Sequence, residues 1–156
     1  MRCLLSVLAF VFLAVSAAAQ PMPSPDLTPE EVVRLQVEAL QRNDEPRPDA
    51  GIATAFRFAS PGNRRATGPL ERFAAMVKGP VYGDMLGFES AEYGVMRVEG
   101  DLAAQRVTLV QSDGRRVRYV FGLSKQTGGD CAGCWMTDSV VREADPPGRE
   151  NGLRRI

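Results

Sequence analysis

The chain has 156 residues, with 19 basic and 19 acidic side chains and no histidine. The length suits one domain with one core, and the balanced charge excludes the basic surface by which proteins bind nucleic acid. The lack of histidine excludes Ser-His-Asp and Cys-His triads, and also every metal or haem site that needs an imidazole.

Residues 1–19 are typical of a secretory signal peptide. A positive charge at Arg2 precedes an apolar run that ends at Val15, and small residues up to Ala19 form the cleavage site. We expect cleavage before Gln20 and a periplasmic or secreted protein without a membrane segment. The alternative is an uncleaved N-terminal anchor, against which the small residues argue. Loss of Arg2 leaves 18 basic and 19 acidic groups, a net charge of −1.

The proline-rich residues 20–26 predict a flexible linker, and one domain is expected over residues 27–143. The stretch 27–44 predicts the first helix, because Thr28 and Glu31 match a T-x-x-E capping box. The apolar stripe of this helix is expected to comprise Val32, Leu35, Ala39 and Leu40.

Two further helices are predicted. Residues 48–60 form a short one that Asp49 caps, and residues 68–77 form the third with Pro69 in its first turn. The residues between them, 61–68, contain proline and glycine and predict a loop.

From residue 88 the apolar period changes from 3.6 to 2, which indicates strands. Four are expected, over residues 88–100, 102–111, 115–126 and 134–143. Helices followed by strands predict an α+β fold, with three N-terminal helices packed on a curved four-stranded antiparallel meander. Residues 144–156 predict a disordered tail.

Five runs of the sequence carry a resemblance to a known family. They are VVRLQVEALQRND, GIATAFRFASPGNR, TGPLERFAAMV, AEYGVMRVEGDLAAQRV and GCWMTDSV. These runs are similar to a bacterial domain-of-unknown-function family, number 4864, over nearly all of residues 27–141. The order of elements also resembles the cone-shaped nuclear-transport-factor-2-like (SnoaL-like) fold. The resemblance implies a cone-like fold and no activity, because a fold does not supply a function.

Cys131 and Cys134 form a C-x-x-C motif before the last predicted strand. In an exported protein a structural disulfide is favoured. Unpaired thiols without a role, a redox pair and a metal site are the alternatives, although a redox pair prefers a helix N-terminus and zinc needs four ligands. The sequence therefore predicts a disulfide and no metal. The sequence contains no glycine-rich phosphate-binding loop and no calcium-binding loop, so no cofactor is expected.

Asp138 is a candidate catalytic base. Alternation places it on one strand face with Cys134, Met136 and Val140, and an acid on an apolar face is either paired or functional. Enzymes of the cone fold that the chain resembles use such an acid with a tyrosine for isomerase or dehydratase chemistry. Tyr93 or Tyr119 would polarise the carbonyl of the substrate here. An exposed or hydrogen-bonded Asp138 without catalytic function is the alternative.

The leading hypothesis is a non-catalytic domain that binds a small molecule or a protein partner in a cleft between helices and sheet. Arg57, Phe56 and Trp135 are the candidate ligand-binding residues, since aromatic side chains with polar neighbours line such clefts. The alternatives are a solvated arginine and ordinary core aromatics. A third hypothesis is a homodimer through the outer sheet face, which carries Arg106, Thr108, Arg116 and Arg118 by alternation.

Overall fold

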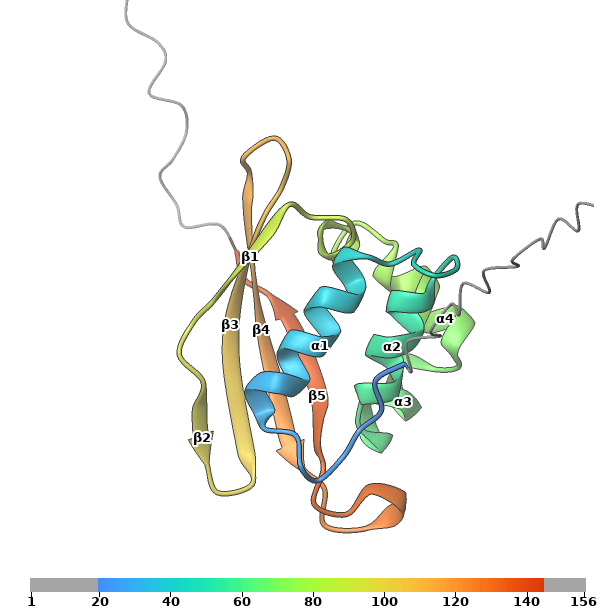
Figure 1. Cartoon of the computed structure of the whole chain (residues 1–156), viewed down its shortest axis with the longest axis vertical. Helices are drawn as coiled ribbons and strands as arrows, with labels where there is room; N and C mark the ends of the chain where they lie inside the picture. Colours follow the sequence, from blue (N-terminus) through green and yellow to red (C-terminus); the bar gives the residue numbers. More distant parts are fainter. Residues whose placement is uncertain (1–19, 145–156) are drawn as a thin grey trace, which may run out of the picture.

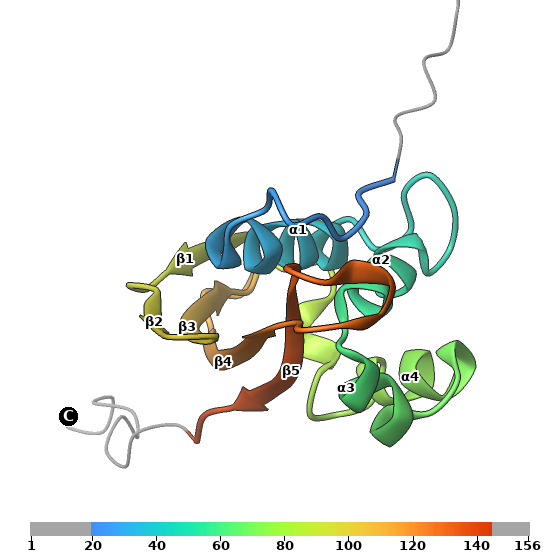
Figure 2. The same ribbon diagram turned by 90° about the horizontal axis from the view of Figure 1, so that it is seen from below.

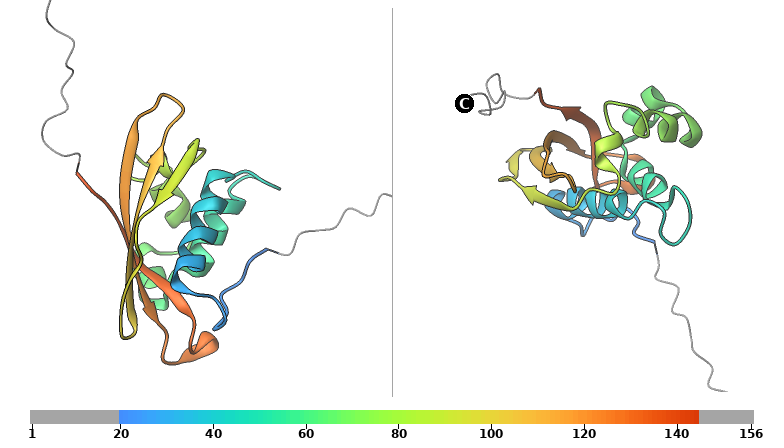
Figure 3. Two further views of the ribbon diagram at one scale, coloured as in Figure 1. Left: turned by 60° about the vertical axis from the view of Figure 1, so that its left-hand side comes forward. Right: turned by 90° about the horizontal axis from the view of Figure 1, so that it is seen from above.

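The computed structural model describes residues 20–144, so the predicted signal peptide and residues 145–156 of the predicted tail lie outside it. Helices cover one face of an open, twisted antiparallel sheet (Figures 1 and 3). The helices are α1 (Pro29–Gln41), α2 (Ala50–Phe58), α3 (Pro61–Thr67) and α4 (Leu70–Val77). The strands are β1 (Ser90–Tyr93), β2 (Arg97–Glu99), β3 (Leu102–Val110), β4 (Arg116–Lys125) and β5 (Trp135–Arg142). The α+β class is confirmed.

Helix α1 begins with the capping box that the sequence predicts. The Thr28 hydroxyl accepts from the Glu31 backbone N–H at 3.2 Å, and the Glu31 carboxylate accepts from the Thr28 N–H at 2.7 Å. The Thr28 backbone N–H and hydroxyl both donate to the Glu31 carboxylate and hold its pKa below its usual value. The predicted stripe is partly wrong, because Leu35 and Ala39 are only half-buried. The buried face comprises Pro29, Val32, Val33, Gln36, Val37 and Leu40.

Helix α2 packs tightly across α1. A Cβ on Gly51 would lie 2.1 Å from the Ala39 carbonyl oxygen, so only glycine allows this approach. The predicted Asp49 cap is wrong, since that side chain makes no capping bond and pairs instead with Lys78 at 2.6 Å. The Asn43 side-chain oxygen, at the end of α1, accepts from the Ile52 N–H at 3.0 Å and takes the cap's place.

The predicted loop at residues 61–68 is wrong, because residues Pro61–Thr67 form helix α3. Its start repeats the chemistry of α1: the Ser60 hydroxyl accepts from the Asn63 N–H, and Pro61 stands in the first turn. The fold therefore has four helices where three were expected. Helices α3 and α4 lie beside the β5 edge of the sheet, whereas α1 lies across its face (Figure 2).

The sheet order is β1-β3-β4-β5, with β2 also paired to β3. The expected first strand, 88–100, is divided in two, because residues 94–96 leave the ladder between β1 and β2. Five strands therefore replace the expected four. The long β3–β4 hairpin turns at residues 112–114, as predicted, and its alternating burial gives the sheet one inner and one outer face.

Strand β5 contains a bulge at Asp138. Thr137 pairs with Leu123 and Ser139 with Gly122, so Asp138 is one extra residue without a partner on β4. The prediction that Asp138 shares a face with Val140 is therefore wrong. Thr137 and Val140 face inward, like the β4 residues that they pair with, whereas Asp138 is exposed. A Cβ on Gly122 would lie 2.9 Å from the Ser139 hydroxyl, so glycine fits the bulge.

The outer sheet face is charged, and its charges are paired within the chain. Arg106 binds Glu143 at 2.7 Å, Arg118 lies 3.5 Å from the same carboxylate, and Arg116 pairs with Glu92. The predicted alternation of Arg106, Arg116 and Arg118 on this face is confirmed. Within residues 20–144, no helix is both long enough and apolar enough to cross a membrane.

Candidate functional site

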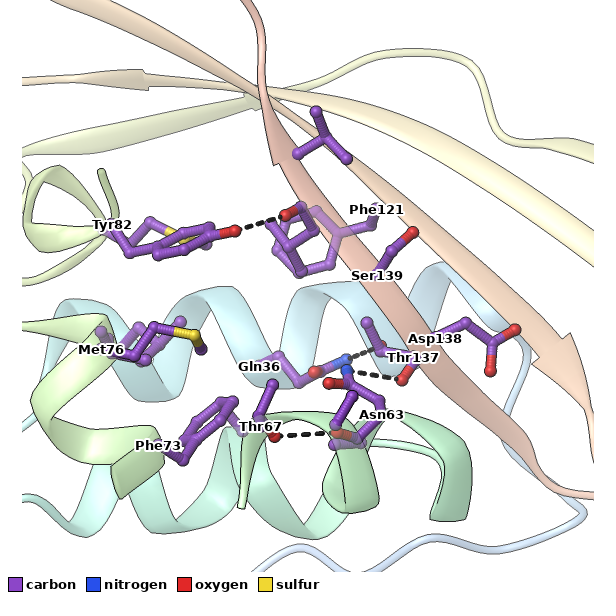
Figure 4. A pocket seen from close by; sticks show the side chains of 18 residues that line it. Gln36, Asn63, Thr67, Phe73, Met76, Tyr82, Phe121, Thr137, Asp138 and Ser139 are labelled. Carbon is purple, nitrogen blue, oxygen red and sulfur yellow. Dashed lines mark hydrogen bonds between the residues drawn. The ribbon is translucent and has the colours of Figure 1, made fainter. Parts of the chain in front are cut away.

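A pocket of about 380 Å³ opens between β5 and the helices (Figure 4). Every helix contributes to it, together with β4, β5 and the turn before β1. Its walls are mainly apolar, and the side chains that form them include Leu40, Phe73, Met76, Met85, Phe121 and Val140. Helix α4 packs against α2, and the pocket lies between these helices and β5.

Two side-chain amides and two hydroxyls gather at one end of this pocket. Gln36 of α1 donates from Nε2 to the Val32 carbonyl at 3.0 Å and to Thr137 Oγ1 at 2.8 Å. Asn63 of α3 donates from Nδ2 to the Thr137 carbonyl at 3.0 Å, and the Thr67 hydroxyl donates to the Asn63 carbonyl at 2.9 Å. Figure 4 shows both amides meeting at Thr137. These bonds join α1, α3 and β5 at the polar end of the pocket.

Tyr82 provides the other polar group of the pocket. Its hydroxyl donates to the Val140 carbonyl at 3.0 Å, the dashed bond beside Tyr82 in Figure 4. The ring also stacks on Tyr119 with centroids 6.3 Å apart. The phenol proton is therefore already used, and the ring contributes apolar surface to the pocket.

Asp138 is the one ionisable carboxylate among the residues that line the pocket, and no lysine or arginine lines it. The bulge in β5 places Asp138 at the rim of the pocket, and this residue is exposed to solvent. The interior of the pocket is therefore uncharged.

The structure does not bring the three predicted catalytic residues together. Tyr119 pairs with Arg142 rather than with the bulge, and its hydroxyl donates to the Val81 carbonyl at 2.8 Å. Burial raises the pKa of Tyr119 to about 12. Tyr93 lies on β1, at the opposite edge of the sheet, with the Arg34 guanidinium 4.4 Å from its ring centre. Burial raises the pKa of Tyr93, and Arg34 opposes this shift.

The three predicted ligand-binding residues do not line this pocket. Phe56 packs behind its wall, with its ring centre 5.1 Å from that of Phe73, and Trp135 is buried in the core. Arg57 lies on a separate hollow beside the disulfide loop, where it donates to Gln20 Oε1 at 2.7 Å and to Thr54 Oγ1 at 2.9 Å. Residues of the predicted linker thus contact the domain.

Cys131 and Cys134 form a disulfide, as the sequence predicts. The bond closes the loop before β5, and the Cys134 backbone N–H donates to the Cys131 carbonyl at 3.0 Å. Within residues 20–144, no cluster of three or more Cys, Asp or Glu side chains is arranged to hold a metal ion.

Sequence reasoning missed the polar end of the pocket. The sequence does mark Gln36 as unusual. It lies four residues after Val32 and four before Leu40, so it is a polar residue on the apolar stripe of the helix. Nothing in the sequence placed Asn63 in this pocket, since its segment was predicted to be a loop. Thr137 was placed by alternation on the face opposite Asp138, but the bulge decides which residues face inward.

Comparison with known proteins gives one family. The model of the family described as "Domain of unknown function (DUF4864)" matches residues 24–146. No curated protein matches the chain, and neither does any solved structure.

Proposed function

Because the chain belongs to the DUF4864 family, whose description assigns no activity, we propose a function from the pocket itself: the domain binds a small, mainly apolar molecule between its helices and β5. The observation that carries the proposal is a preformed space of about 380 Å³ with apolar walls and a few converging polar groups. Small-molecule sites have this character and volumes of roughly 300–1,000 Å³. The cone-like enclosure that the resemblance implies is part of the same proposal.

The test is a titration with the neutral fluorophore N-phenyl-1-naphthylamine, which brightens in apolar surroundings. We expect saturable binding to the wild type. Ala55 of α2 lines the pocket and Ala75 of α4 is exposed, so Ala55→Phe and Ala75→Phe add the same side chain inside and outside it. Ala55→Phe is expected to weaken binding at least about tenfold, since it fills the space that the ligand needs.

The control, Ala75→Phe, is expected to bind like the wild type. Ala66→Phe, on α3 at the same pocket, provides a second blocking variant if Ala55→Phe unfolds. Equal affinity of the wild type and both blocking variants would mean that the probe binds elsewhere, and the proposal would be wrong.

The proposal includes export from the cytoplasm. The disulfide supports it, since such bonds persist in oxidising compartments. The intact mass of the protein recovered from its native compartment is expected to begin at Gln20, and alkylation without a reductant is expected to add nothing. A chain that retains residues 1–19, or two alkylated thiols, would contradict this part.

Catalysis by Asp138 with Tyr93 or Tyr119 stays a prediction without a supporting contact. The ion pairs on the outer sheet face leave dimerisation there without a specific observation in its favour. Asp138→Asn is expected to leave binding of the neutral fluorophore unchanged, because this side chain lies at the rim and not between the apolar walls.

A further inference from the structure

The orientation of the two amides in the pocket is fixed by backbone carbonyls. A carbonyl oxygen only accepts hydrogen bonds, so the Gln36 nitrogen must face the Val32 oxygen and the Asn63 nitrogen must face the Thr137 oxygen. A flip of either amide would place two acceptors against each other. The oxygens Oε1 of Gln36 and Oδ1 of Asn63 therefore point away from these carbonyls.

Both amide oxygens are acceptors without a donor among residues 20–144. The hydrogen bonds of Gln36 and Asn63 use only their nitrogens, and both residues line the pocket. Gln36 is 3% exposed and Thr137 is 2% exposed, whereas Asn63 is half-buried, and neither amide oxygen is fully buried. Both oxygens can therefore be reached, and a ligand that covers them without offering a donor would leave them unpaired at a cost in free energy. The polar end is thus built to receive a hydrogen-bond donor.

The charge of the pocket limits which donor fits. The lining has no lysine or arginine, so an anionic group would enter without a partner. A cation would find the Asp138 carboxylate only at the exposed rim. Neutral donors are hydroxyl groups and amide N–H groups. A hydroxyl also accepts, and Thr137 Oγ1, which accepts from Gln36, keeps its own proton for such a partner.

We propose that the ligand is an uncharged, mainly apolar alcohol or phenol, whose hydroxyl donates to Gln36 Oε1 or Asn63 Oδ1. This inference rests on the proposed binding function and names the ligand class of the same pocket. A ligand with a hydroxyl group can donate to these oxygens, whereas a ligand without a donor would exclude water from them and leave them unpaired. Ligands are therefore selected by their donor group and not by size alone.

The experiment compares two isomers of one formula. 4-Propylphenol and 4-ethylanisole have the same atoms, but only the phenol donates a hydrogen bond. Each displaces N-phenyl-1-naphthylamine from the full-length mature protein, and calorimetry gives the two affinities directly. We expect the phenol to bind about fivefold to tenfold more tightly, the effect of one hydrogen bond to an otherwise unpaired acceptor.

The variants Gln36→Met and Asn63→Leu remove one amide each at nearly constant volume. Each is expected to reduce the preference for the phenol, and the double variant is expected to abolish it while the fluorophore still binds. Met76→Leu changes an apolar wall residue of the same pocket and is expected to keep the preference. Asn63→Leu keeps the test available if Gln36→Met unfolds, because Asn63 lies on the half-exposed helix α3.

Three outcomes would overturn the inference. Equal affinities of the phenol and the ether in the wild type would show that no donor is selected, although the pocket binds. A preference that survives in the double variant would place the acceptor elsewhere. Failure of the fluorophore and both isomers to bind the wild type would remove the proposed function, and the ligand class would fall with it.

Discussion

Helix α1 lies across the face of the sheet and the pair α3–α4 lies beside its β5 edge, and the two regions differ in how completely their side chains are buried. Beneath α1 the core is filled: Val32, Val33 and Val37 are at most 1% exposed and meet the inner face of β3 and β4. Beside β5, α3 has no buried residue and α4 buries only Phe73 and Val77. The two regions differ in how many side chains their helices bury against the rest of the domain.

The difference teaches that a pocket arises where helices are held in place by contacts that leave part of the space in front of the sheet unfilled. Helix α4 packs on α2, and the polar contacts of Asn63 with Thr137 hold α3 at β5. Neither contact needs side chains to fill the space between them. Stability is therefore concentrated under α1, and the region at β5 is free to exchange packing for a ligand.

The largest expected effect comes from the same change made at a fully buried core residue of α2 and at the pocket wall. Phe58→Ala, at a side chain that is 0% exposed, is expected to lower the free energy of unfolding by about 4 kcal/mol. Phe73→Ala, at the pocket wall, is expected to lower it by about 2 kcal/mol, because part of its ring already faces empty space. Urea denaturation measures both, and equal losses would contradict the contrast.

The next effect compares the same glycine-to-alanine substitution at the tight contact between α1 and α2 and in the loosely packed helix α3. Gly51→Ala would place a Cβ against the backbone of α1, and we expect a loss of about 3 kcal/mol in unfolding free energy. Gly62→Ala in α3 meets nothing closer than 3.7 Å and is expected to stabilise the protein by about 0.5 kcal/mol. Thermal denaturation decides between them. A destabilising Gly62→Ala would show that α3 is as tightly packed as α2.

The disulfide lies outside both regions and provides a smaller effect. Replacing Cys131 and Cys134 by alanine is expected to cost about 2 kcal/mol of unfolding free energy, because the closed loop is short. Fluorophore binding is expected to be unchanged, since neither cysteine lines the pocket. A parallel titration of wild type and variant tests this, and a large loss of affinity would show that the loop holds β5 in its binding position.

The smallest effect concerns Tyr119. This residue of β4 is buried in the core, and its ring stacks on that of Tyr82 in the pocket. Its pKa is raised to about 12 by burial, above the ordinary value of 10.0. Its contribution to stability is therefore complete below pH 10 and is lost as the pH rises from 10 to about 12. Tyr119→Phe is expected to remove the highest-pH step from a tyrosine absorbance titration. Persistence of that step would assign it to another tyrosine.

Local signals in the sequence predicted much of the fold. The capping box of α1, the β3–β4 hairpin and the C-x-x-C disulfide all depend on residues close together in the chain. The start of α3 carried the same kind of signal, in Ser60 and Pro61, but the glycine after them favoured a loop.

The candidate site was not predictable in the same way. It depends on one extra residue in β5, Asp138, which changes which side chains face inward. That bulge follows from the register with β4, where Gly122 gives room opposite Ser139. The sequence of one strand does not reveal how it pairs with a strand far away in the chain. Thr137 was therefore not recognised as the residue that joins the amides of Gln36 and Asn63.

The most direct test of the binding pocket uses methionine methyl groups as reporters. Met76 and Met85 line the pocket, Met22 and Met136 line the separate hollow beside Arg57, and Met96 lines neither. In a methyl NMR spectrum of protein labelled with carbon-13 at methionine, 4-propylphenol is expected to shift the signals of Met76 and Met85 with one saturating curve. The signals of Met22, Met96 and Met136 are expected to stay in place. Unshifted Met76 and Met85 signals at saturating phenol, or shifts confined to Met22 and Met136, would contradict the account.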